Sequence, residues 1–373
     1  MRSADPSTKR ERLPVIDVLR FCAALGVLVF HASAFAEMPK RVMPTIRLFG
    51  HSITGIPSIF SFGASGVSLF FVISGFCLFL SARRTPQPLV AYLANRVARI
   101  YPAYLFALAL SAVVVFFVSG YWNGLDIVLK AFFLHGFVQS YNLSLNGALW
   151  SMATEVQFYI AFPVLFAAVQ RYGAWHCLLV ALAACLIFRM GVDHMPGAEI
   201  VAGGIVRGAF LSNLLPGRLA EFIAGMAVAS FYLDHARALR KWAAYAVIPL
   251  MTAAIVARGA GPNWLAEPAL GLGFSALLAF AVTHMASTFR AASPFALLGR
   301  ASYSLFLIHI PALLVVIHTV DLHRLGLYAR LIVMLAAGLP ICLALALAMY
   351  AWLELPLWKR LSTKKFRSAL VPA

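Results

Sequence analysis

An arginine and a histidine lie in the first apolar stretch of this sequence. Arg20 and His31 belong to the run DVLRFCAALGVLVFH (residues 17–31) and are eleven residues apart. In a helix this spacing brings the two side chains to within about 20° of each other, separated by roughly 16 Å along the axis. A buried arginine is costly unless it faces a partner or a wet cavity, and a neutral imidazole can accept a proton from a hydroxyl. The spacing therefore indicates a polar interior in which His31 is a candidate general base. The alternative is structural: Arg20 pairs with Asp17, and His31 binds a backbone carbonyl.

Two further arginines follow the second apolar run. Arg96 and Arg99 lie three residues apart in NRVARIYPAYL, which places them on one face of a helix. Guanidinium groups bind phosphates in a bidentate manner, so this pair would suit a nucleotide-bearing donor such as coenzyme A. The alternative is that the pair only sets the topology of the chain.

A carboxylate lies in the otherwise apolar fourth run, ALWSMATEVQFYIAFP. Counted from the outer end, Glu155 has a depth close to that of His31, so its carboxylate could orient the imidazole and stabilise the charged ring. A structural hydrogen bond between helices is the alternative. Similarly, Arg218 and Glu221 are three residues apart and are expected to neutralise each other, and His309 is expected to bond between helices.

Small residues fill the run GASGVSLFFVISGF (residues 63–76). Ser74 and Gly75 are expected to permit close helix packing. They could instead leave a gap that admits a slender acyl or pantetheine chain, and the sequence does not decide between the two.

The composition determines which kind of protein carries these residues. The chain is 62% hydrophobic and 12% charged, with a mean hydropathy of +0.87, which is typical of a polytopic membrane protein. The net charge of +17 is explained by basic loops at an anionic lipid surface, so nucleic acid is not an expected partner. The five cysteines lack metal-ligand spacing, so no metal site is expected.

The apolar runs predict an all-α bundle of about ten transmembrane helices. An excess of Lys and Arg on one side places both termini in the cytoplasm. Basic tails, 1–14 and 357–373, flank one transmembrane domain, 15–356. The run 125–138 is too short to cross and predicts a re-entrant or interfacial helix. The predicted spans are 15–36, 58–81, 101–119, 148–169, 174–190, 215–232, 240–257, 266–286, 302–319 and 327–353.

Seven motifs, spread in order over almost the whole chain, resemble the membrane acyltransferase 3 family of the O-antigen acetylase type. They are IDVLRFCAALGVLVFH, GVSLFFVISGF, RVARIYPAYL, ALWSMATEVQFY, PGRLAEFIAGM, LGRASYSLFLIHIP and WLELP. The resemblance implies a ten-helix enzyme of a bacterial inner membrane. It would move an acetyl or other short acyl group from acyl-CoA to a hydroxyl of an envelope polysaccharide, a lipid-linked sugar or an exported oligosaccharide.

By position, His31 matches the essential histidine of the family, and Arg20 matches its partner in the same motif. Arg96 and Arg99 match the basic pair, and Glu155 matches the acidic residue after Trp-Ser. The expected mechanism binds the acyl-CoA phosphates at Arg96, Arg99 and Arg20, with the pantetheine arm reaching towards His31. That histidine would act as general base or as transient acyl carrier.

No permanently bound cofactor is expected, because acyl-CoA, with acetyl-CoA the first choice, is a substrate. Some family members carry a fused SGNH domain for which this sequence has no room, so a mechanism that needs one would require a separate periplasmic transferase. The alternative function is a polytopic transporter or exporter without acyl-transfer activity.

Overall fold

The computed structural model describes residues 13–38, 46–48, 51–53, 60–202, 204–289, 293–320 and 322–361. Most of the two expected tails, 1–14 and 357–373, lies outside these residues. Among the described residues, ten helices are long and apolar enough to cross a membrane. The chain is therefore a multi-pass membrane protein with an all-α core, as the sequence predicts.

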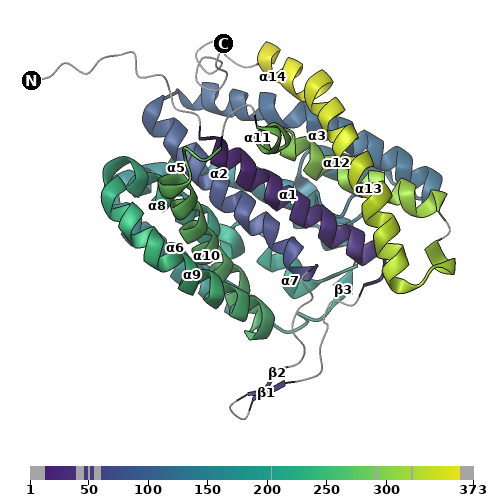
Figure 1. Ribbon diagram of the computed structural model, residues 1–373, viewed down its shortest axis with the longest axis horizontal. Coiled ribbons are helices and arrows are strands. Elements are labelled where there is room, and N and C mark those ends of the chain that lie inside the picture. Colours follow the sequence, from purple (N-terminus) through teal and green to yellow (C-terminus); the bar gives the residue numbers. More distant parts are fainter. Residues whose placement is uncertain are drawn as a thin grey trace, which may run out of the picture.

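The ten long helices lie side by side in a tilted bundle (Figure 1). They are α1 (Pro14–Phe35), α2 (Gly66–Arg84), α3 (Leu89–Ser119), α5 (Trp150–Tyr172), α6 (Ala174–Asp193), α8 (Leu215–Asp234), α9 (Ala236–Ala260), α10 (Asn263–His284), α12 (Ser302–Thr319) and α13 (Leu327–Met349).

Shorter elements connect them. The helical ones are η1 (Ser61–Ser65), α4 (Gly124–Ala131), η2 (Leu134–Phe137), η3 (Gln139–Tyr141), α7 (Arg207–Ser212), α11 (Pro294–Arg300), η4 (Leu322–Arg324), the π-helix η5 (Tyr350–Glu354) and α14 (Leu355–Leu361). The strands form two antiparallel hairpins, β1 (Ile46–Leu48) with β2 (His51–Ile53) and β3 (Val201–Ala202) with β4 (Ile205–Val206).

Most helix ends lie within a few residues of the predicted spans, but α3 differs. It begins at Leu89, directly after Pro88, and runs for 31 residues, whereas the predicted span begins at 101. Arginine is a good helix former, so Arg96 and Arg99 interrupt the apolar pattern without ending the helix. The basic pair therefore lies within α3 and not in a loop before it.

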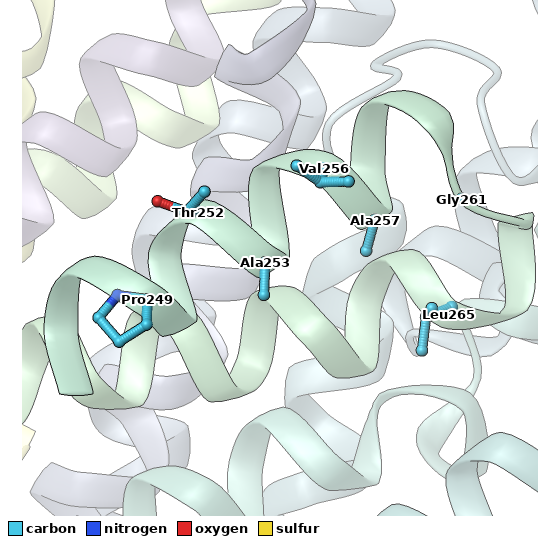
Figure 2. A pocket seen from close by; sticks show the side chains of 7 residues that line it. All are labelled: Pro249, Thr252, Ala253, Val256, Ala257, Gly261 and Leu265. Atoms are coloured by element: carbon cyan, nitrogen blue, oxygen red, sulfur yellow. The ribbon is translucent and has the colours of Figure 1, made fainter. Parts of the chain in front are cut away.

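Helix α9 lies at the edge of the bundle, where it packs mainly on α10. An open groove of about 630 Å³ follows its surface (Figure 2). Its lining is apolar apart from one threonine: Pro249, Thr252, Ala253, Val256, Ala257, Gly261 and Leu265. None of the predicted site residues lines this groove.

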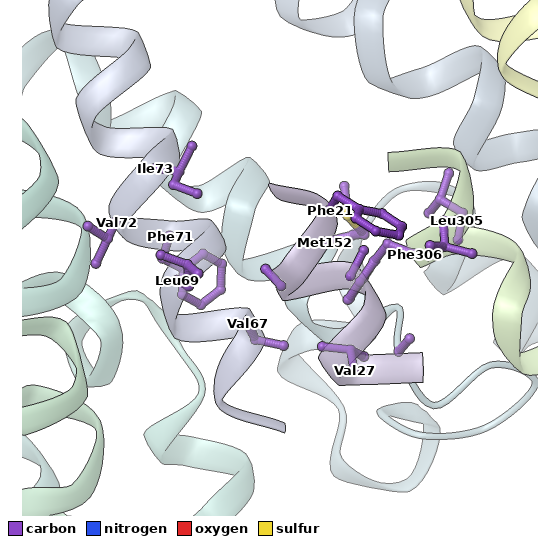
Figure 3. Packing of buried hydrophobic residues seen from close by; sticks show 14 of the residues in the cluster. Phe21, Val27, Val67, Leu69, Phe71, Val72, Ile73, Met152, Leu305 and Phe306 are labelled. Atoms are coloured by element: carbon purple, nitrogen blue, oxygen red, sulfur yellow. The ribbon is translucent and has the colours of Figure 1, made fainter. Parts of the chain in front are cut away.

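The core lies where α1, α2, α5 and α12 meet (Figure 3). Val27 of α1 and Val67 of α2 point towards each other, and in the same view Phe21 of α1 lies on the side of Leu305 and Phe306 of α12. The helix that carries Arg20 and His31 is thus an interior element, with one face turned to protein along much of its length.

Candidate functional site

Arg20 lies about two turns into α1, and its side chain is half-buried. Its Nη2 donates to Cys77 Sγ of α2 at 3.5 Å. Asp17 and Glu155 both lie within electrostatic reach of this guanidinium. We call this part of the molecule the Arg20 end of the bundle. A cation held here between two carboxylates is stabilised inside an apolar bundle.

Arg96 lies beside the aromatic rings of α3 and α5. Its guanidinium lies 5.8 Å from the ring centre of Tyr92 and 5.9 Å from that of Tyr159. Tyr159 in turn donates a hydrogen bond to the carboxylate of Glu155, and Arg96 is within electrostatic reach of that carboxylate. The arginine is therefore held by cation–π contacts and by charge at the Arg20 end.

Glu354 adds a third carboxylate to this end, besides Asp17 and Glu155. It is 7% exposed, belongs to the π-helix η5 that follows α13, and accepts a hydrogen bond from Ser304 Oγ at 2.6 Å. Arg99 and Arg20 both lie within electrostatic reach of it. A π-helix at this point is a common mark of a functional region.

The Arg20 end thus collects residues from α1, α3, α5 and η5. Arg20, Arg96 and Arg99 supply three cations, and Asp17, Glu155 and Glu354 supply three anions. The formal charges of these six groups cancel, so a phosphate would bind here through the guanidinium donors and not through an excess of positive charge.

At the other end of α1, the ring of His31 contacts the ring of His309 from α12. His31 Nδ1 lies 3.2 Å from His309 Nε2, and the ring centres are 5.0 Å apart. His31 Nδ1 is also 2.9 Å from the carbonyl oxygen of Val27, one turn earlier in α1. Both neighbours of His31 Nδ1 are therefore groups of the protein itself. We call this region the His31 end.

The structure corrects the expected contact between His31 and Glu155. Among the described residues, the carboxylate of Glu155 bonds Tyr159 and, at 3.4 Å, Ser74 Oγ, while the ring of His31 bonds Val27 and His309. The expectation of equal depth for His31 and Glu155 depends on counting residues from the helix ends. Because the helices are tilted and differ in length, equal residue counts do not give equal depths. Glu155 belongs to the Arg20 end.

The glycines of the run 63–76 pack helices together. A Cβ added to Gly75 would overlap the carbonyl oxygen of Phe222 in α8, and one added to Gly63 would overlap that of Gly26 in α1. No acyl chain can pass at these contacts, so the alternative of a gap at Gly75 is wrong. Ser74 differs, because its hydroxyl faces Glu155.

The segment that was predicted to be re-entrant or interfacial enters the bundle. Phe133 packs on Tyr104 with ring centres 4.4 Å apart, and Tyr104 donates to the carbonyl oxygen of Lys130 at 2.8 Å. Since Tyr104 lies in the middle of α3, the segment descends well below the helix ends. This favours the re-entrant alternative.

An ion pair buried within the protein holds this segment. Lys130 and Asp126 are both 0% exposed, with Nζ and Oδ1 3.2 Å apart. Lys130 also donates to the carbonyl oxygen of Tyr141 and to Ser144 Oγ. Burial lowers the pKa of Lys130 to about 8, and Asp126 opposes this shift.

The chain continues from this run to Asn146, which reaches α12 close to the two histidines; we call residues 124–146 the re-entrant segment. Asn146 Nδ2 donates to the carbonyl oxygen of Leu307 at 2.9 Å and to Ser111 Oγ at 3.1 Å. Leu307 is two residues before His309. These hydrogen bonds therefore hold the segment against the turn of α12 that precedes His309.

A further charged network joins α6, α8 and α10, and through Arg218 it also contacts Ser68 of α2 and the ring of Trp150 in α5. Arg218 bonds Glu221 at 3.0 Å, as the sequence predicts, and Glu267 lies 3.8 Å from the same guanidinium. Arg189 bonds Glu267 and also the backbone carbonyls of Asn263 and Trp264. These bonds tie helix ends together, so we interpret the network as structural.

His309 and Glu354 are the residues whose position the sequence did not reveal. His309 was expected to bond between helices, and it does, although its neighbour is the candidate base itself. Glu354 is the acidic residue of the WLELP motif, an isolated carboxylate at the end of a long apolar run. That isolation is the signal by which it could have been found.

Comparisons with known proteins show which proteins this chain is similar to. The acyltransferase MdmB of Streptomyces mycarofaciens is 27% identical over 232 residues, which cover 58% of this chain and 57% of that protein. The exopolysaccharide production protein ExoZ of Rhizobium meliloti is 27% identical over 339 residues, which cover 83% of this chain and 94% of ExoZ. Nodulation protein 10 of Rhizobium leguminosarum bv. viciae is 26% identical over 190 residues, 45% of this chain and 48% of that protein.

The chain thus spans about half the length of two of these relatives and nearly all of the third. No solved structure gives a significant match. The family model described as an acyltransferase domain matches residues 13–351, from the start of α1 to the beginning of η5, and therefore includes every predicted site residue. This chain belongs to that acyltransferase family, the acyltransferase 3 family.

Proposed function

We propose that this protein is an acyl-CoA-dependent O-acyltransferase of a bacterial inner membrane. It transfers an acetyl or other short acyl group to a hydroxyl of a carbohydrate-containing acceptor. The observation that carries the proposal is that the two ends of α1 differ. One end lies in a cluster of arginines, and the other carries a half-buried histidine. The family match supports the reaction class.

The Arg20 end binds the nucleotide of acyl-CoA in this proposal. Arg96 and Arg99 lie on one face of α3, and with Arg20 they can bind the donor's phosphates through charge-assisted bonds. This end faces the cytoplasm, where acyl-CoA is made, and the basic loops of the chain agree with that orientation. The pantetheine arm is long enough to cover much of the roughly 16 Å of helix between Arg20 and His31.

His31 carries the chemistry. A ring nitrogen takes the proton of the acceptor hydroxyl as the oxygen attacks the thioester carbonyl, the carbon–sulfur bond breaks, and the thiolate leaves with the proton from the imidazolium. In the second form of the proposal the ring nitrogen attacks first and carries the acyl group before the hydroxyl takes it. Both forms yield one acyl ester and one free CoA thiol.

The acceptor approaches the His31 end from the outer side of the membrane. A carbohydrate is supported by the name of ExoZ, an exopolysaccharide production protein, which covers most of this chain. The re-entrant segment with Lys130 and Asn146 lies next to this end. It would therefore form part of the wall that an acceptor meets.

Deletion of the gene tests the function in the cell. Mass spectrometry of the surface polysaccharide should show the loss of one acyl group per modified unit, which the wild-type gene restores. His31→Gln should not restore it, although immunoblots show equal amounts of protein in the membrane. Restored acylation by His31→Gln would remove this histidine from the mechanism. Unchanged acylation combined with lost export in the deletion strain would favour a transporter.

A further inference from the structure

The histidine contact between α1 and α12 has a defined donor and acceptor. His309 Nδ1 lies 2.8 Å from the carbonyl oxygen of Phe306 and 3.3 Å from that of Leu305, three and four residues earlier in α12. A carbonyl oxygen only accepts, so Nδ1 of His309 must carry the hydrogen. In a neutral ring, Nε2 of His309 is then an acceptor.

The tautomer of His31 follows from that of His309. The two neighbours of His31 Nδ1 are the acceptor nitrogen of His309, at 3.2 Å, and the carbonyl oxygen of Val27, at 2.9 Å. Both are acceptors, so Nδ1 of His31 carries the hydrogen. His31 Nε2 is therefore the unprotonated nitrogen, and it has the lone pair that a base or nucleophile needs.

We propose that His309 is a positioning residue that holds His31 in the tautomer and orientation in which Nε2 reacts. This deepens the proposed function and rests on it. His309 resembles the third member of a catalytic triad in its place, because it binds the ring nitrogen that does not react. It differs in being neutral, so it orients the ring without adding a buried charge.

Burial and packing suit His309 to this role. His309 is 1% exposed, whereas His31 is half-buried. Of the two rings, His31 is therefore the one that a substrate can reach. Two backbone carbonyls fix the ring of His309 in its own helix. Asn146 bonds the carbonyl of Leu307 in the same turn, which ties that turn to the re-entrant segment.

The bond also has a role during turnover. When His31 Nε2 gains the hydroxyl proton, the ring becomes a cation whose Nδ1–H still donates to His309 Nε2. Hydrogen bonds from charged groups are stronger than those between neutral groups. The contact should therefore stabilise the charged ring more than the resting one, and its loss should lower kcat more than it changes donor binding.

Three substitutions of His309 separate orientation from packing. His309→Leu fills much of the volume and removes the acceptor. His309→Asn keeps an amide near the position of Nδ1, too short to reach His31, whereas His309→Gln can place its amide oxygen near the position of Nε2. The control is His318→Leu on the same helix, because His318 is exposed and bonds only the carbonyl of Leu314 among the contacts described for it.

The assay uses the full-length protein in nanodiscs, with [14C]acetyl-CoA as donor and polysaccharide from the deletion strain as acceptor. We expect His309→Leu and His309→Asn to lower kcat roughly 10- to 100-fold, the effect of losing one hydrogen bond to a charged group. The KM for acetyl-CoA should stay within about twofold, and His309→Gln should recover most of kcat. His318→Leu should behave as wild type.

Two results would overturn the proposal while the wild type is active and His31→Gln is not. The first is a wild-type kcat for His309→Leu. The second is a kcat of His309→Gln as low as that of His309→Asn, with the two variants equally stable to heat. An inactive wild type, or an active His31→Gln, would instead contradict the proposed function.

A spectroscopic readout does not depend on activity. In histidine-labelled protein, a 15N–15N coupling across the hydrogen bond should join His31 Nδ1 and His309 Nε2 and disappear in His31→Gln. Absence of that coupling in a folded wild type would refute the pairing.

Discussion

Replacement of Arg99 by methionine tests how the donor binds. Methionine keeps much of the length of the side chain and removes the guanidinium. If Arg99 binds a phosphate of acyl-CoA, one charge-assisted contact is lost, which is worth roughly 1.5 to 3 kcal/mol. At about 1.4 kcal/mol per factor of ten, this is a roughly 10- to 100-fold rise in KM for acetyl-CoA. The kcat should change little, because this contact is present both before and during the reaction.

A second comparison uses the separation of the two residues, because Arg99 of α3 belongs to the Arg20 end of the bundle and His31 of α1 to the opposite end. Acetyl-pantetheine carries the same thioester but lacks the nucleotide and its phosphates. Arg99→Met should therefore turn over acetyl-pantetheine at the wild-type kcat/KM, while His31→Gln should fail with both donors. Initial rates of thiol release with each donor measure this directly.

Arg83→Met is the matched control. Arg83 lies at the same end of the bundle, where it bonds Asp234 at 3.0 Å and Gln170 at 3.2 Å on the surface. An exposed ion pair contributes little, so this variant should keep the KM of the wild type. An unchanged KM of Arg99→Met, or an equal loss with both donors, would refute the phosphate role of Arg99.

Three further predictions concern stability and are measured by thermal unfolding in detergent micelles or nanodiscs. Lys130→Met should lower the free energy of unfolding by about 3–5 kcal/mol, because it leaves the carboxylate of Asp126 buried without its cation. Adding Asp126→Asn should recover part of this loss. Unchanged stability of Lys130→Met would contradict the buried pair. Burial lowers the pKa of His135 from 6.5 to about 4, so the unfolded chain binds a proton first and stability falls as pH drops from 6.5 to 4. Between pH 7 and pH 5 the wild type should lose about 2 kcal/mol more than His135→Gln does, and an equal loss in both would refute this. Gly75→Val should cost about 1–3 kcal/mol or more by forcing α2 away from α8, whereas Gly191→Ala, which faces open space, should be neutral; a neutral Gly75→Val would refute the close contact.

The sequence predicted what depends on local periodicity. The long apolar runs define the ten helices because an apolar run of that length has few other stable forms in a membrane. The common face of Arg20 and His31 follows from helix geometry alone, and α1 is continuous between them. The ion pair of Arg218 with Glu221 is likewise a contact within one turn.

The sequence could not predict which residues of different helices meet. Glu155 was paired with His31 by counting residues from helix ends, but helix tilt and length place it beside Tyr159 and Ser74. The contact between His31 and His309 joins residues 278 positions apart, and no local pattern contains it. Gly75 is a similar case, because only the position of α8 shows that its small size serves packing.

A single-turnover experiment on the purified protein in nanodiscs tests whether His31 carries out acyl transfer. [14C]Acetyl-CoA and polysaccharide from the deletion strain are mixed with excess protein, and free CoA thiol and labelled polysaccharide are followed together. We expect the wild type to form the two products in equal amounts, and His31→Gln to bind acetyl-CoA with wild-type affinity yet form neither. Equal product formation by His31→Gln, or labelled polysaccharide without thiol release, would contradict this expectation.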